Sequence, residues 1–115
     1  MNEEAFELVL LDEAVEFLNS LPDSEKDKVF YNIHRVVKGE RNGELFKKLE
    51  NTNIWEFRTL YNKMAYRLFA FWDTEANTLV VATHGIIKKT QKTPPKEIAK
   101  AEAIRIEYFN SKSNG

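Results

Sequence analysis

Three neighbouring segments with the apolar patterns of β-strands dominate the second half of the chain. They read IWEFRT (54–59), YRLFAFW (66–72) and TLVVATH (78–84), and short polar links join them. Runs of β-branched and aromatic residues bounded by Asn and Asp are typical of strands. Strands that follow each other so closely predict an antiparallel meander, so the chain has to fold around a sheet.

The first half of the chain predicts a strand followed by two helices. AFELVLL (5–11) has the composition of a strand, and Asp12 can cap a short helix over residues 13–21 that Pro22 ends. Asp23 or Ser24 begins a second helix, and Gly39 stands where the end of a helix favours left-handed geometry. The apolar stripe of this helix consists of Val29, Phe30, Ile33, Val36 and Val37. A further strand, LFKKLE (45–50), leads into the meander.

The chain closes on a predicted amphipathic helix. Thr93 is the expected cap, Pro94 is the expected first helical position, and the tail from about residue 110 is expected to be disordered. The apolar side of this helix carries Ile98, Ala101, Ile104 and Tyr108.

The strand around YRLFAFW has apolar side chains on both faces. Alternation places Tyr66, Leu68, Ala70 and Trp72 on one face, and Phe69 and Phe71 with Arg67 on the other. Both faces therefore need cover, by the helical hairpin on one side and by the terminal helix at the margin of the other. The predicted fold class is α+β, with an antiparallel meander packed against an N-terminal helical hairpin and a C-terminal helix, in a single domain of 115 residues.

Composition narrows the possible functions. The chain has no cysteine, which excludes disulfides, thiol catalysis and thiolate metal sites, and its two histidines do not have the spacing of a metal site. No apolar run approaches the roughly 20 residues of a membrane span, and the acidic start MNEEAFE does not resemble a signal peptide. We therefore expect a cytoplasmic protein without a metal ion.

The net charge of −1 hides an asymmetry between the two halves of the chain. Residues 1–57 contain 7 Lys and Arg against 13 Asp and Glu, whereas residues 58–115 contain 10 against 5. Within residues 83–96 there are four lysines, Lys88, Lys89, Lys92 and Lys96, and no acid. Such a field suits phosphates, although a solvated basic loop explains the same run equally well.

The order of these elements, with KKLE, W-E-F-R, Y-R-L and the loop H-G-x-x-K-K-T-Q-K-T-P, resembles the RelE/ParE superfamily of toxins, in its HigB-like, phage-derived branch. The resemblance extends from Ala5 to about Phe109. It implies a RelE-like fold and the toxin of a type II toxin-antitoxin system. The implied activity is metal-independent endoribonuclease cleavage of mRNA at the ribosome, without a cofactor. The implied partner is a helix-turn-helix antitoxin from an adjacent gene, which forms a hetero-oligomer with a toxin that is monomeric when free.

Cleavage of RNA without a metal needs a base for the ribose 2′-hydroxyl, cations for the phosphate and an acid for the departing 5′-oxygen. The resemblance implies that Arg67 is the phosphate-binding arginine and that Arg58 supports it. Another branch of the superfamily uses a glutamate base and a histidine acid, roles that Glu56 and His84 could fill. Lys88 or Lys89 is expected near the scissile phosphate. The residues expected to hold the RNA are Lys92, Lys47, Lys48 and Gln91.

Structural explanations compete with these roles. Arg67 could instead pair with Glu56 across the sheet, His84 could bond a backbone carbonyl, and Thr93 could be only a helix cap. Tyr61, Tyr66 and Trp55 could stack on bases, but aromatic residues in a meander are more often core. At the level of function, the alternatives are a ParE-like inhibitor of DNA gyrase and a catalytically silent binding module, because a fold does not fix chemistry.

Overall fold

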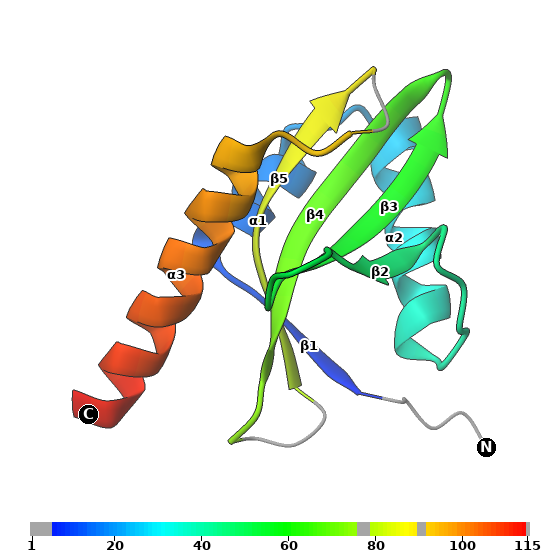
Figure 1. Ribbon diagram of the computed structural model, residues 1–115. Coiled ribbons are helices and arrows are strands. Elements are labelled where there is room, and N and C mark those ends of the chain that lie inside the picture. Colours follow the sequence, from blue (N-terminus) through cyan, green and yellow to red (C-terminus); the bar gives the residue numbers. More distant parts are fainter. Residues whose placement is uncertain (1–5, 76–78, 90–91, 115) are drawn as a thin grey trace.

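The computed structural model describes residues 6–75, 79–89 and 92–114, which form one five-stranded sheet and three helices (Figure 1). The strands are β1 (Glu7–Leu10), β2 (Phe46–Lys48), β3 (Trp55–Tyr61), β4 (Met64–Asp73) and β5 (Leu79–Lys88). The helices are α1 (Asp12–Asn19), α2 (Asp23–Val37) and α3 (Pro95–Asn114). Each predicted element is present, in the predicted order.

The strand order in the sheet is β1-β5-β4-β3-β2. Strands β2 to β5 pair antiparallel with their sequence neighbours, which confirms the predicted meander. Strand β1 adds to β5 in parallel, with Glu7 opposite Leu79 and Leu10 opposite Ala82. The sheet is therefore mixed, because the helical hairpin carries the chain from β1 across one face to the opposite edge.

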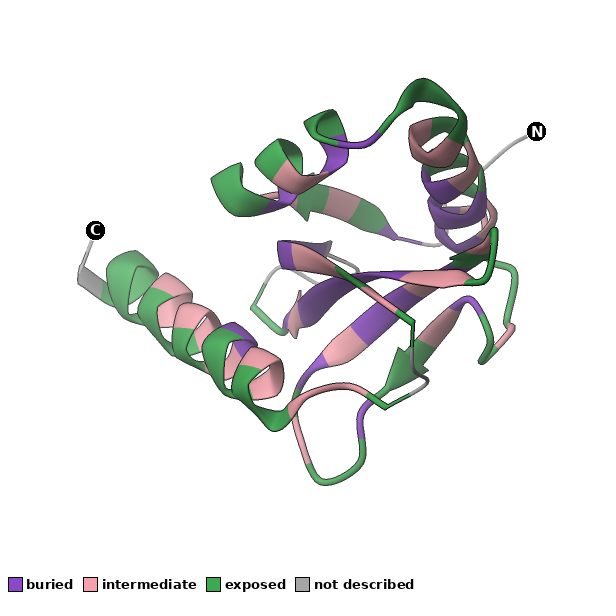
Figure 2. Ribbon diagram, turned by 90° about the horizontal axis from the view of Figure 1, so that it is seen from above, coloured by how far each residue is buried: buried purple, intermediate pink, exposed green. Residues whose placement is uncertain are grey.

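Helices cover the two faces of the sheet unequally (Figures 1 and 2). Helices α1 and α2 pack on the face that presents Tyr66, Leu68 and Ala70, and this side forms the larger core. Helix α3 lies across the other face, where Ala101 and partly buried residues of α3 pack on Phe69 and Phe71. Both face assignments made from the sequence are confirmed.

Helix ends follow the sequence signals in part. Gly39 adopts φ 107°, its N–H binds Val36 O, and the N–H of Glu40 binds Arg35 O, which together form a Schellman motif as predicted. The prediction that Asp12 caps α1 is wrong, because Leu11 is the N-cap. Asp12 instead lies in the first helical turn, where the helix dipole favours its negative charge.

Three smaller expectations also change. Phe30, placed in the apolar stripe of α2, is 40% exposed. Helix α3 begins at Pro95 rather than Pro94. The helix continues to Asn114, so the tail expected to be disordered from about residue 110 is helical as far as it is described. None of the helices in the described ranges has the length and apolar character that a membrane crossing requires.

Candidate functional site

A basic hollow opens beside the edge strand β2, on the side of the sheet where α3 begins. Its volume is about 350 Å³. It is lined by Lys47, Lys48, Leu49, Glu50, Glu56, Arg58, Lys92, Thr93 and Ile98. We call this site the basic hollow. Four cations from three separate segments therefore meet there, and three of them are the predicted RNA-holding lysines.

Strand register explains the convergence. Lys47 pairs with Glu56, and Arg58 pairs with Arg67 on the next strand. Directly paired residues share a face, so these four side chains belong to the face that α3 covers. Lys48 follows Lys47 and pairs with Trp55, so its side chain belongs to the opposite face, and it reaches the basic hollow from the sheet edge.

A buried polar network forms the floor of the basic hollow. Glu56 is 2% exposed and Arg67 is 0% exposed. Glu56 Oε1 lies 3.3 Å from Arg58 Nε and 3.9 Å from Arg67 Nε. The Thr93 hydroxyl donates to Glu56 Oε2 at 2.6 Å and accepts from Arg67 Nη1 at 3.1 Å. Burial lowers the pKa of the Arg67 guanidinium, against the opposite effect of Glu56.

The position of Arg67 combines two of the interpretations made from the sequence. The residue is paired with Glu56 across the sheet, as the structural explanation expected. The pair faces Thr93 and the basic loop, as a functional role requires. In this conformation Arg67 is fully buried and bonded to Thr93, so direct contact with a phosphate would require the segment around Thr93, just before α3, to move.

His84 occupies a second environment, under the first turn of α3. Its Nδ1 lies 2.9 Å from Thr83 Oγ1, its Nε2 lies 3.1 Å from Glu97 Oε1, and its ring packs on Phe69 at 4.9 Å between centroids. Burial lowers the pKa of His84 and outweighs the hydrogen bond to the Glu97 carboxylate, which raises it. Within the described residues, His84 does not line the basic hollow, so the structure does not bring the predicted acid and base together there.

The remaining predicted residues lie around the margin. Lys88 ends β5 opposite Ala65, and Lys89 is exposed directly after it. Neither belongs to the part of the basic hollow that the described residues form. Gln91 lies outside the described residues.

The three lysines of the basic hollow, unlike Arg58, are not paired with a described carboxylate. Among the residues that the structure describes, no acidic side chain forms an ion pair with Lys47, Lys48 or Lys92. The lining of the basic hollow therefore carries more positive than negative side chains, even though the whole chain is slightly acidic.

Residues 16–105 match the model of the phage derived protein Gp49-like family (DUF891). The chain belongs to this family. No curated protein sequence matches this Gp49-like chain.

Solved structures show the fold of the Gp49-like chain elsewhere. A mutant of the E. coli toxin RelE in the free state is 16% identical, with a TM-score of 0.62 over 89% of this chain and 98% of that chain. The intact E. coli RelBE toxin-antitoxin complex matches with a TM-score of 0.54 and 16% identity, over 76% of this chain and 100% of that chain. The archaeal RelE-RelB complex from Pyrococcus horikoshii OT3 matches with a TM-score of 0.50 and 15% identity, over 76% of this chain and 99% of that chain. The resemblance to RelE is thus confirmed for the fold.

Two residues of the Gp49-like chain have contacts that the sequence did not reveal. Thr93 was interpreted as a helix cap, yet its hydroxyl joins Glu56 to Arg67. Gly85 was noted only as part of a motif, yet a Cβ there would lie 2.2 Å from the ring of Phe17. No local sequence pattern predicts these contacts, because Thr93 and Gly85 each touch residues from distant segments of the chain.

Proposed function

We propose that this Gp49-like protein is the toxin of a type II toxin-antitoxin system and acts as a metal-independent endoribonuclease on mRNA at the ribosome. The observation that carries the proposal is the basic hollow, where cations from three segments surround a carboxylate. This combination suits a ribonucleotide backbone, since cations hold the phosphate while a carboxylate can accept a proton. The RelE-like fold agrees with it.

The proposed reaction is an internal transesterification. The ribose 2′-oxygen attacks the phosphorus and forms the 2′-O–P bond, the P–O5′ bond breaks, and the products are a 2′,3′-cyclic phosphate and a 5′-hydroxyl. Glu56 accepts the proton from the 2′-hydroxyl. Arg58, with the lysines of the basic hollow, balances the charge that develops on the phosphate oxygens. The proton for the 5′-oxygen is assigned to Lys88 or Lys89, which the resemblance places near the scissile phosphate, rather than to His84, which is buried under the first turn of α3.

Arg67 acts through Glu56 in this proposal. A buried guanidinium close to the carboxylate, linked to it by Thr93, fixes the orientation of that carboxylate. Arg67→Ala would leave a buried carboxylate without this partner and would lower stability as well as activity. Replacing exposed lysines at the rim of the basic hollow by neutral residues therefore tests the proposal better.

The proposed partner is an antitoxin. Two of the similar solved structures are complexes of a RelE protein with RelB. A polypeptide that places acidic side chains in the basic hollow would neutralise the unpaired lysines and exclude RNA.

The deciding experiment is expression in bacterial cells with mapping of transcript ends, together with an assay of DNA supercoiling. We expect cuts within translated regions, unchanged supercoiling, and loss of both cuts and growth arrest in Glu56→Gln and in the double variant Lys47→Gln/Lys92→Gln. Lys28→Gln removes one positive charge from α2, away from the basic hollow, and should change nothing. Altered supercoiling without cuts would favour a gyrase inhibitor. Growth without arrest or cuts would favour a silent binding module.

A further inference from the structure

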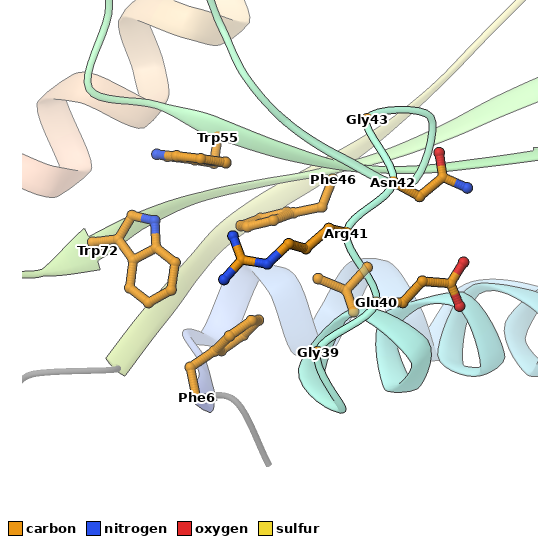
Figure 3. Close-up of a pocket in the computed structure, with 10 residues that line it drawn as sticks. Phe6, Gly39, Glu40, Arg41, Asn42, Gly43, Phe46, Trp55 and Trp72 are labelled. Atoms are coloured by element: carbon orange, nitrogen blue, oxygen red, sulfur yellow. The ribbon is translucent and has the colours of Figure 1, made fainter.

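A second hollow lies on the other side of strand β2, and its walls are aromatic. Its volume is about 460 Å³. Four rings surround it, from Phe6, Phe46, Trp55 and Trp72, and the loop after α2 borders it on the right in the view of Figure 3. We call this site the aromatic hollow.

The rings support one another but leave a space between them. Phe46 stacks on Trp55 at 4.8 Å with an interplanar angle of 24°. Trp72 meets Phe6 edge-on at 5.2 Å and Trp55 at 6.2 Å. Both tryptophans and Phe46 are only half-buried. Aromatic rings that served only as core would close on each other, whereas here part of their surface faces a hollow.

Arg41 supplies a charged group to the same hollow. Its side chain extends from the loop after α2 and points between the rings of Phe6, Phe46 and Trp72 (Figure 3). The neighbouring Glu40 is held by Arg35, with Nε and Oε1 2.8 Å apart. In the described ranges of the chain, no acidic side chain forms an ion pair with Arg41. The aromatic hollow therefore offers flat apolar walls and one planar cation.

The aromatic hollow and the basic hollow lie on opposite faces of the sheet at the same edge. Strand β2 is the last strand of the sheet and only three residues long. Lys48 lines the basic hollow, and its partner Trp55 lines the aromatic hollow. A phosphate backbone held by Lys47 and Lys92 would therefore meet Lys48 at the edge and then the open rings.

We propose that the aromatic hollow binds one base of single-stranded RNA that flanks the cleaved linkage, and that the preferred base is guanine. The proposal rests on the RNA-binding function proposed above. Bases in single-stranded RNA stack on aromatic side chains, and every base offers a flat face. Arginine donates two parallel hydrogen bonds to O6 and N7 of guanine, which is the pattern that Arg41 can supply. The unpaired cation favours this ligand over an apolar side chain of a partner protein.

The test uses the tryptophans themselves, since Trp55 and Trp72 are the only two in the chain. Fluorescein-labelled 2′-O-methyl oligonucleotides, which cannot be cleaved, are titrated while anisotropy and tryptophan emission are recorded. We expect saturable quenching with guanine-containing oligomers and weaker quenching with oligouridine. Arg41→Gln should remove most of the guanine preference and weaken binding about fivefold or more, given about 1–3 kcal/mol for a stacked and bonded base. Arg105→Gln on α3 is the matched control and should leave both signals unchanged.

The outcomes separate this inference from the function on which it rests. Absence of binding by anisotropy would contradict the proposed RNA-binding function. Binding without quenching, with Arg41→Gln equal to the natural protein, would overturn the base site while leaving the basic hollow intact. If RNA leaves the tryptophans open to acrylamide but the antitoxin protects them, the aromatic hollow belongs to a protein interface and the base site is wrong. Lys92→Gln should weaken binding yet show full quenching at saturation.

Discussion

Thr93 illustrates how one hydroxyl can hold two buried charged groups in place. Its hydroxyl donates a hydrogen bond to Glu56 and accepts one from Arg67, so it acts as both donor and acceptor at the floor of the basic hollow. Buried polar groups are costly when left unsatisfied, and the cost is greatest for charged ones.

Thr93→Val should therefore lower the free energy of unfolding by about 1–3 kcal/mol, because the isosteric side chain leaves two charged partners without this hydrogen bond. Thr93→Ser keeps the hydroxyl and should stay close to the natural protein. Urea denaturation monitored by circular dichroism measures both. Equal midpoints for the Val variant and the natural protein would show that the network contributes nothing to stability.

Gly85 is a residue at which a larger side chain would disturb the core. It lies in β5 against the ring of Phe17 of α1, so close that a Cβ atom at this position would overlap the ring. Gly85→Ala should lower the free energy of unfolding by about 1–3 kcal/mol through overpacking. The double variant Gly85→Ala/Phe17→Leu should recover part of this loss by making room. A single alanine variant as stable as the natural protein would mean that the ring moves aside without cost.

At the scale of elements, α3 is held at both ends. In its first turn, Glu97 bonds His84. Near its other end, the Tyr108 hydroxyl lies 2.7 Å from Asp73 Oδ2, and Lys112 Nζ lies 2.6 Å from the same oxygen. Burial alone would raise the pKa of Asp73. The hydrogen bonds from Lys112, from Tyr108 and from the Glu75 N–H outweigh it, so the pKa lies below its ordinary value.

This arrangement predicts the direction of acid destabilisation. An aspartate in an unfolded chain titrates near pH 3.9, so as the pH falls the unfolded state binds the proton before the folded state does. The contribution of Asp73 is complete above about pH 4 and is lost as the pH falls through the folded pKa. Asp73→Asn should be less stable at pH 7 and should lose less stability between pH 5 and pH 2. Denaturant unfolding across this range measures it, and parallel curves for the two proteins would contradict the assignment.

Most elements could be predicted from the sequence, because the strand and helix patterns are local. The parallel pairing of β1 could not, since the edge that a first strand joins depends on where the hairpin carries the chain. The contents of the site were predicted in part. The resemblance identified Lys47, Lys48, Arg58 and Lys92, which meet in one hollow. Burial of Glu56, Arg67 and His84 beneath α3 was not predicted, because it depends on how a helix packs rather than on any motif.

At the scale of the whole molecule, the place where positive side chains gather matters more than the net charge. The acidic first half supplies Lys47 and Lys48, the basic second half supplies Arg58 and Lys92, and the sheet brings them to one edge. The affinity for RNA should consequently fall steeply with salt despite a net charge of −1.

The double variant Lys47→Gln/Lys92→Gln should flatten this dependence. Each phosphate contact on single-stranded nucleic acid contributes about −0.7 to the slope of log K against log salt, so the magnitude of the slope should drop by about 1.4. Anisotropy titrations between about 50 and about 500 mM KCl, roughly one decade of salt concentration, measure the slope. An unchanged slope would mean that the two lysines do not touch phosphates, and Lys28→Gln provides the baseline.

The parallel contact between β1 and β5 also has a consequence for biosynthesis. Strand β1 leaves the ribosome early but finds its partner only when Leu79–Ala82 has emerged, after the hairpin and the rest of the meander. Closing a contact across so long an intervening stretch is slow, and the sheet cannot be completed on a partial chain. A nascent polypeptide released before β5 would therefore lack a finished sheet, and its first strand would have no partner.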